Sequence, residues 1–448
     1  MKDIEFIYKD ALVSRDEVKE TAGVLTSYIG HLSDISKVGK TAPYKIDYNE
    51  AGSSINLPFD SSILEMVNDA VKKVDVKNLK YIIVVGIGGS NLGTKAVYDS
   101  LRGALDPFFA NKTPKIIFAD TNSPKLLKDI RTVLEKNIEV SEEVLINIIS
   151  KSGTTVETIA NFEAIYAFLE ERFEDIKKRV VVTTDHGSKL WEKAEKDGLE
   201  MLPIPQIVGG RYSVFSAVGL FPLALVGIDV TALLNGARVM HDKCVKEDVS
   251  ENYALMSAVV LYLHNKKGIT IHNSFFFNPE LESLGKWYRQ LMAESIGKRY
   301  TTDGKEVHTG ITPIVSIGST DLHSMVQLYL GGLKDKFTTF IYASGNSGKE
   351  AVPKNLVFPD LVEGIEGMEF AKIMDTIFSG VKESYKKGGL PFIEILFPQI
   401  DEYSLGQFLQ FKMIEIMFLA RLFEINAFDQ PNVEDYKKEV RKILLSEK

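Results

Sequence analysis

Short runs of β-branched and other apolar residues alternate with longer amphipathic stretches from about residue 80 onward. Four such runs lie in the first half of the chain: YIIVVGIG (81–88), KIIFAD (115–120), VLINIIS (144–150) and RVVVTTD (179–185). Near-continuous Val and Ile, rather than strict alternation with polar residues, is typical of strands buried on both faces. The segments between the runs are long enough for helices. The pattern therefore predicts an α/β unit built on a parallel sheet.

A second series of runs predicts a second, similar α/β unit: GITIHNSFFF (268–277), TPIVSIGST (312–320) and KFTTFIYAS (336–344). From Leu405 onward, apolar residues recur at three- and four-residue steps, which indicates helix. The first 55 residues are polar and turn-rich. We expect an N-terminal helical arm (1–55), a first α/β domain (56–245), a second α/β domain (246–400) and a C-terminal helical segment (401–448).

Composition narrows the possible partners and the compartment. The chain has 448 residues, of which 45% are hydrophobic and 25% charged, with a formal net charge of −8. No segment concentrates Lys and Arg, so nucleic acid and anionic membrane surfaces are poor candidate partners. The single cysteine, Cys244, allows no disulfide within the chain and fits a reducing compartment. The N-terminal stretch MKDIEFIYKD lacks the apolar core of a signal peptide, and no apolar run is long enough to span a bilayer. We expect a cytoplasmic protein.

The first informative loop is glycine-rich and follows the first predicted strand. In parallel sheets, ligands bind where strands end at their carboxyl termini. Gly86 and Gly88 begin the G-x-G-x-x-G pattern of dinucleotide-binding folds, but Asn91 occupies the position of the third glycine. The spacing argues against a nicotinamide cofactor. It favours a tight turn whose backbone approaches a bound ligand, with the Ser90 hydroxyl beside it.

The second loop, ISKSGTTVET (149–158), crowds hydroxyl groups into the turn after a buried strand. A helix that begins here would direct free backbone N–H groups and its positive dipole end toward a ligand, which is how phosphate binds. Ser150, Ser152, Thr154 and Thr155 would add neutral donors. The alternative is a capping box from Thr154 to Glu157, which would account for one or two of these hydroxyls only. The loop therefore predicts a phosphate-binding site.

Four further stretches carry reactive side chains, each with an ordinary structural explanation. Arg211 in GGRYS (209–213) could stabilise negative charge on an oxygen or belong to a surface turn. Glu294, near the end of a predicted helix, is by itself more typical of a solvated residue. His323 follows the strand at 312–320, and isolated histidines are more often structural than catalytic. Lys437 lies in a charged helix and would, on its own, be interpreted as a surface lysine.

Taken together, these stretches resemble the phosphoglucose isomerase family of the sugar-isomerase (SIS) superfamily. The motifs occur in order along the chain: GIGGS-x-LG (86–93), SKSGTT (150–155), GGRYS (209–213), ES-x-GK (294–298), TDLHS (320–324) and FDQP-x-VE-x-x-K (428–437). The resemblance implies two α/β/α sandwich domains with flavodoxin-like parallel sheets, flanked by an N-terminal arm and C-terminal helices. It also implies a homodimer whose active site lies near the interface, with a histidine commonly donated by the neighbouring chain.

The activity that the resemblance implies is reversible isomerisation of glucose 6-phosphate and fructose 6-phosphate, in glycolysis and gluconeogenesis, without metal or organic cofactor. Ring opening would precede a cis-enediol(ate) intermediate. The catalytic roles fall on Glu294, His323, Lys437 and Arg211. Substrate and phosphate binding fall on eight further residues: Gly89, Ser90, Ser150, Lys151, Ser152, Thr154, Thr155 and Gln430.

Three positions depart from the family pattern or blur it. Asn432 stands where many relatives have Gly, and Asn tolerates a left-handed backbone. Ile296 replaces a residue that is polar in some relatives, and Lys438 adjoins Lys437, so a shift of one residue is open. Two other functions also stay open: isomerisation of mannose 6-phosphate or an amino-sugar phosphate by the same fold, and a sugar-phosphate sensor without turnover. A sensor would have no need of Glu294 and Lys437 together with a histidine.

Overall fold

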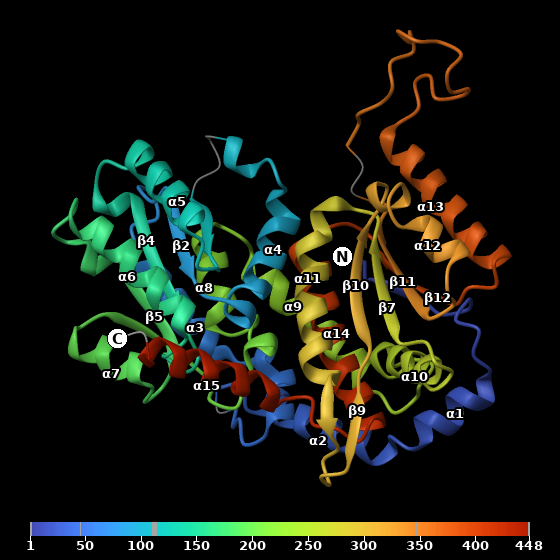
Figure 1. The fold of residues 1–448 in the computed structure, drawn as a ribbon, viewed down its shortest axis with the longest axis horizontal. Coiled ribbons are helices and arrows are strands. Elements are labelled where there is room, and N and C mark those ends of the chain that lie inside the picture. The colour runs from blue at the N-terminus through green and yellow to red at the C-terminus, as the bar shows by residue number, and fades with distance from the viewer. Residues whose placement is uncertain (1, 45, 110–113, 346–347, 447–448) are drawn as a thin grey trace.

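The computed structural model describes residues 2–44, 46–109, 114–345 and 348–446, which build two five-stranded sheets (Figure 1). The strand order of the first sheet is β3-β2-β4-β5-β6, and all its strands are parallel. Its strands are β2 (Tyr81–Val85), β3 (Lys115–Ala119), β4 (Val144–Ile149), β5 (Val180–Asp185) and β6 (Glu200–Ile204). Four of them coincide with the predicted runs. The sequence analysis missed β6, an edge strand that contains Pro203, a residue that edge strands tolerate.

Both faces of the first sheet are buried, which explains its near-continuous apolar runs. In β2, Ile82 and Val84 point into one core, whereas Ile83 and Val85 point into another. The helices α3 (Ser61–Lys73), α4 (Leu92–Arg102) and α8 (Ala217–Leu225) pack on the first of these faces. The opposite face is covered by α5 (Pro124–Asn137), α6 (Val156–Glu170) and α7 (Lys189–Lys196). Successive strand side chains alternate between the two buried faces, so apolar residues predominate at neighbouring positions.

The second sheet has the order β1-β12-β11-β7-β10 and is parallel except for its edge strand β1. Its strands are β1 (Glu5–Ile7), β7 (Ile271–Phe276), β10 (Thr312–Ile317), β11 (Lys336–Ala343) and β12 (Phe392–Phe397). Three of them match predicted runs, and β1 and β12 were not predicted. The apolar run of β12 is interrupted by Glu394, which is buried and forms an ion pair with Lys382 at 2.7 Å. The N-terminal segment therefore contributes a strand as well as the helices α1 (Arg15–Gly23) and α2 (Thr26–Thr41).

The helix α14 (Glu402–Leu422) runs through the centre of the molecule beside α11 (Glu282–Ile296), α9 (Val230–Cys244) and α10 (Tyr253–Lys266) (Figure 1). Every residue of α14 except Glu402 and Arg421 is buried, including the charged Lys412 and Glu415, which pair with each other. Two glycines let α9 and α14 approach closely. A Cβ on Gly236 would lie 1.9 Å from the Tyr403 carbonyl oxygen, and one on Gly406 would lie 1.9 Å from the Leu233 carbonyl oxygen.

The remaining elements lie at the periphery of the two sheets. They are the hairpin of β8 (Lys298–Tyr300) and β9 (Glu306–Thr309), and the helices α12 (Val326–Gly331), α13 (Phe370–Lys387) and α15 (Pro431–Ser446). Figure 1 shows α15, in red, beside the first sheet with its C-terminal end toward α7, while the segment before α13 projects from the body. Within the described residues, no helix combines the length and apolarity needed to cross a membrane.

Candidate active site

The hydroxyl-rich loop connects β4 to α6 and leaves most of its hydroxyl groups available to a ligand. Its helix begins at Val156, and the N-cap residue Thr155 makes no side-chain capping bond. The capping-box alternative is therefore not realised. The Ser150 and Thr155 hydroxyls lie 3.1 Å apart, and Thr184 donates to the Ser150 carbonyl at 2.6 Å, which ties the loop to β5. Gly153 has a φ of 66°, a left-handed conformation that favours glycine at the turn.

A small pocket of about 70 Å³ separates this loop from α15. From the loop it is lined by Ser152, Thr154 and Thr155, and from the helix by Lys437 and Arg441, among other residues. The lining also includes the carboxylates of Glu157 and Glu434, so the neutral hydroxyl donors are the groups that the loop itself offers to an anionic ligand.

The structure also separates the two adjacent lysines of α15. Lys437 lines the pocket and its Nζ lies 2.8 Å from Glu434. Lys438 points elsewhere, toward Asp435 at 3.9 Å, with 68% of its side chain exposed. Lys437 is thus the one of the pair that faces the hydroxyl loop.

The glycine-rich loop brings a second segment of the chain against the first sheet. A Cβ on Gly89 would lie 2.2 Å from the Gly210 carbonyl carbon and 2.5 Å from the Arg211 nitrogen. Only a residue without a side chain allows this contact between two backbones. The contact explains the pair of glycine-rich motifs: each removes a Cβ, so that Arg211 sits directly beside the turn that carries Ser90.

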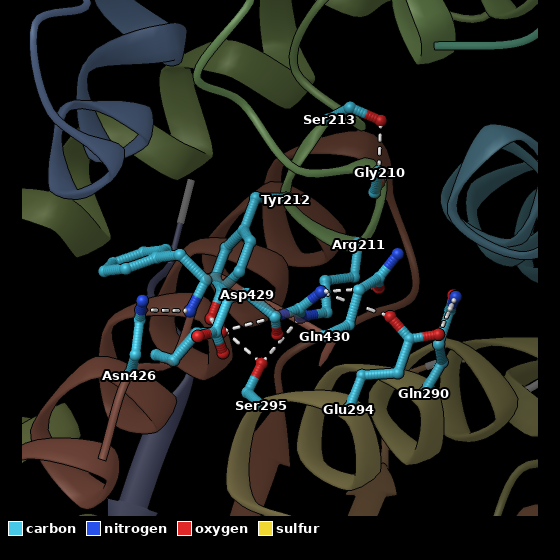
Figure 2. Close-up of polar contacts among 12 residues, drawn as sticks. Gly210, Arg211, Tyr212, Ser213, Gln290, Glu294, Ser295, Asn426, Asp429 and Gln430 are labelled. Carbon is cyan, nitrogen blue, oxygen red and sulfur yellow. Dashed lines mark hydrogen bonds and ion pairs between the residues drawn. The ribbon is translucent and has the colours of Figure 1, made fainter. Parts of the chain in front are cut away.

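Arg211 is buried, with 2% exposure, and all its donors face acceptors from two separate parts of the chain, residues 294–295 and 427–430 (Figure 2). Its Nε donates to the Ser295 hydroxyl at 2.8 Å. Its Nη1 lies 3.2 Å from both Glu294 Oε2 and Gln430 Oε1. Its Nη2 donates to the Ala427 and Asp429 carbonyl groups at 2.5 and 3.1 Å. One guanidinium thereby fixes the end of α11 to the segment 427–430.

Glu294 occupies the last turn of α11 with both carboxylate oxygens engaged. Oε2 faces Arg211, and Oε1 accepts a hydrogen bond from Gln290 Nε2 at 2.9 Å (Figure 2). Its side chain is 27% exposed, so the carboxylate is held in place yet still open to a ligand. The sequence analysis missed Gln290. The signal was its position four residues before Glu294, on the same face of the helix.

His323 follows β10, which packs against the beginning of α11 rather than the end that carries Glu294. It is exposed on the turn after β10, and no hydrogen bond or ion pair joins its imidazole ring to any described residue. A Cβ on Gly285, early in α11, would touch Val315 near the end of β10, and Gly318 donates to the Phe276 carbonyl at the end of β7. His323 therefore sits toward the beginning of α11. Glu294 lies nine residues beyond Gly285, which is about 13 Å along the helix in the other direction.

The hydroxyl loop also holds a partly buried pair of opposite charges. Burial lowers the pKa of Lys151, while nearby Asp185 acts in the opposite direction. Burial raises the pKa of Asp185 to about 6, although the charge of Lys151 counteracts this shift. The Asp185 Oδ1 atom is buried and accepts no hydrogen bond from the described residues. Burial therefore disfavours the charged form of both side chains.

The fold and these loops define an α/β protein of the sugar-isomerase class. A hypothetical protein from Thermus thermophilus has the same fold, with a TM-score of 0.80 and 27% identity over 98% of this chain and 99% of that one. A glucose-6-phosphate isomerase structure from Chlamydia trachomatis also has a TM-score of 0.80, with 19% identity over 99% and 89% of the two chains.

Sequence comparison identifies the family. The glucose-6-phosphate isomerase of Methanocaldococcus jannaschii is 34% identical over 399 residues, which cover 88% of this chain and 93% of that protein. The family described as "Phosphoglucose isomerase" matches residues 61–448. The chain belongs to the phosphoglucose isomerase family and is an isomerase.

Proposed function

We propose that the protein interconverts glucose 6-phosphate and fructose 6-phosphate, as the names of its relatives describe, and that it serves glycolysis and gluconeogenesis in the cytoplasm. One observation carries the proposal: a carboxylate, Glu294, is held by Arg211 and Gln290 on the side of the molecule where Gly89 brings the glycine-rich turn against Arg211. In this proposal a base, a fixed cation and a ligand-binding turn act together on one substrate.

In this proposal the phosphate is bound by Ser150, Ser152, Thr154 and Thr155, with Gly89, Ser90 and Lys151 beside them. Neutral hydroxyls replace water around the dianion, and Lys437 and Arg441 approach from the other wall of the same pocket. Anchoring the phosphate orients the carbon chain toward Glu294, so that the reaction becomes effectively intramolecular.

Glu294 then removes the proton from C2 and returns it to C1, or the reverse. The bonding electrons of the broken C–H bond form the C1–C2 double bond of a planar cis-enediol(ate), and the carbonyl oxygen takes up the negative charge. Arg211 lies beside the carboxylate and stabilises this developing charge. A preorganised donor of this kind contributes about 3–4 kcal/mol to transition-state binding. Gln430, held by Arg211, and Gln290 orient the hydroxyl groups of the reacting end.

Ring opening requires a second acid–base pair, which we assign to His323 and Lys437. Because His323 is distant from Glu294 in this chain, the assignment requires a histidine from a second copy. Two exposed apolar surfaces support a homodimer. One consists of Leu328, Leu330 and Leu333 close after His323. The other is the projecting segment before α13, with exposed Val357, Phe358, Leu361 and Val362 (Figure 1). Apolar patches of this kind mark interaction sites.

The base is tested by Glu294→Gln, with exchange of the C2 proton for solvent deuterium as the measurement. Exchange and isomerisation should both be lost while substrate binding persists. Glu282→Gln is a matched control, because Glu282 lies on the same helix but forms an exposed ion pair with Lys286. Exchange at the wild-type rate would reject Glu294 as the base. Parallel assays with glucose 6-phosphate, mannose 6-phosphate and glucosamine 6-phosphate, in the presence of a chelator, identify the substrate.

The donated histidine is tested by mixing two inactive variants, His323→Ala and Glu294→Gln. A mixed dimer would contain one site with both native residues, so random assembly should restore about a quarter of wild-type activity. No recovery after subunit exchange would show that His323 acts within its own chain or has no part in catalysis.

A further inference from the structure

Lys298 follows α11 directly and buries its ammonium group between two segments of the site. Only 4% of its side chain is exposed. Its Nζ donates to the Glu294 carbonyl oxygen at 2.7 Å and to the Asp429 carbonyl oxygen at 2.6 Å, and it lies 3.1 Å from Asp429 Oδ1. An ammonium group has three N–H donors, so these three acceptors satisfy it completely.

On one side, Lys298 completes the end of the helix that carries Glu294. The last carbonyl groups of a helix have no partner within it, and a cation there also complements the helix dipole. Here the carbonyl group that receives the cation is that of Glu294 itself. Holding this peptide group fixes the backbone from which the carboxylate extends.

On the other side, Lys298 holds residues 427–430, which we call the strap because they join α14 to α15. The Asp429 carbonyl oxygen accepts from both Lys298 and Arg211. Immediately after the strap comes α15, which has no buried residue and carries Lys437. With so little packing of its own, α15 depends on the strap for its position.

We infer that Lys298 is a positioning residue that couples the base-bearing end of α11 to the strap, and so sets the placement of Glu294, Gln430 and Lys437 relative to one another. Lys298 contacts the backbone carbonyl group of Glu294 and forms no hydrogen bond with its carboxylate. The catalytic part of this inference rests on the proposed function, whereas the coupling of the two segments does not. Burial lowers the pKa of Lys298, whereas the nearby Asp429 carboxylate acts in the opposite direction. Asp429 therefore helps to keep the Lys298 ammonium group charged.

The coupling is tested by amide hydrogen exchange on the full-length protein without substrate. Lys298→Met keeps the length of the side chain and removes its donors. Exchange should accelerate in residues 427–446 and in the last turn of α11, while residues 150–158 remain as protected as in the wild type. Asp429→Asn removes the negative charge that faces Lys298 but keeps a side-chain oxygen that can accept, so it should produce a smaller change in the same segments. Lys286→Met is the matched control, because Lys286 lies on α11 but is exposed.

The catalytic consequence is tested with the same variants. Misplacement by about 1 Å can lower a rate about 100-fold, so Lys298→Met should lower kcat by about 10- to 100-fold and leave KM within about threefold. Lys298→Arg, which retains a cation and several donors, should recover part of the loss. Unchanged exchange in the strap and α11 would overturn the coupling whatever the enzyme's substrate. Altered exchange with wild-type kcat would overturn the positioning role, and an inactive wild-type protein would instead reject the proposed function.

Discussion

The buried ion pair of Lys412 and Glu415 on α14 leads to a quantitative prediction about stability. The two side chains are 1% and 0% exposed, and Lys412 Nζ lies 2.7 Å from Glu415 Oε2. The same carboxylate accepts from the Ser257 hydroxyl at 2.5 Å and from the Tyr288 hydroxyl. Lys412 has no other hydrogen-bond acceptor among the described residues and otherwise faces aromatic rings, including that of Tyr288 at 4.7 Å.

We expect Lys412→Met to lower the free energy of unfolding by about 3 kcal/mol. Breaking one side of a buried ion pair costs about 3–5 kcal/mol, because the remaining charge is left uncompensated. Glu415 keeps its two hydroxyl donors in this variant, so we expect a loss at the lower end of the range of about 3–5 kcal/mol. Methionine has a similar volume to lysine, so the creation of a cavity adds little.

The second substitution should reverse most of this loss. In Lys412→Met/Glu415→Gln neither charge remains, and the glutamine oxygen can still accept from Ser257 and Tyr288. We expect the double variant to lie within about 1 kcal/mol of the wild type, because replacing a buried pair by neutral groups is often nearly neutral. Adding Glu415→Gln should therefore stabilise the protein in the Lys412→Met background and destabilise it in the native one.

Urea unfolding followed by circular dichroism measures all four proteins of this cycle. Two results would refute the reasoning. One is a loss below about 1 kcal/mol for Lys412→Met, and the other is a double variant as unstable as the sum of the single ones.

Three further predictions concern the site. Gly89→Ala should lower kcat/KM by about 100-fold, because the Cβ of the new alanine would displace the Arg211 backbone. Gly380→Ala is the control, because a Cβ at that position would have no atom within 4 Å. Thr154→Val should raise KM about 10- to 100-fold and change kcat little, since a hydrogen bond to bound phosphate persists through the reaction. Burial raises the pKa of Asp185 from 3.8 to about 6. The protonated carboxyl group therefore favours the folded state below about pH 3.8, and this stabilisation is lost as the pH rises through about 6. Asp185→Asn should therefore raise the Tm at about pH 8 and have little effect at about pH 4.

Each of these has a contrary outcome. Full activity in Gly89→Ala would mean that the loop at Arg211 can move without consequence. A loss confined to kcat in Thr154→Val would place its hydroxyl at the reacting carbons. Equal effects of Asp185→Asn on the Tm at both pH values would show that ionisation of this carboxyl group does not limit stability.

Several features of this protein follow from its sequence alone, because they depend on local patterns. Strands buried on both faces are mostly apolar, so seven of the ten strands in the two main sheets were predicted from runs rich in apolar residues. The three missed strands lie at or next to sheet edges, where Pro203 and Glu394 are tolerated. The hydroxyl-rich loop could also be predicted from the sequence, because one short segment contains the end of its strand, its turn and the start of its helix.

The tertiary structure decided how the site is assembled. Arg211 meets Glu294 across 83 residues and Gln430 across 219, and no local pattern encodes such pairings. Neither Gln290 nor Lys298 was assigned a role from the sequence. In the folded protein, Gln290 donates to the Glu294 carboxylate, and Lys298 donates to the backbone carbonyl groups of Glu294 and Asp429. The same folding places His323 at the far end of α11 from Glu294. Sequence determines which chemical groups are present and their local conformation, but the tertiary packing of distant segments determines which of those groups meet.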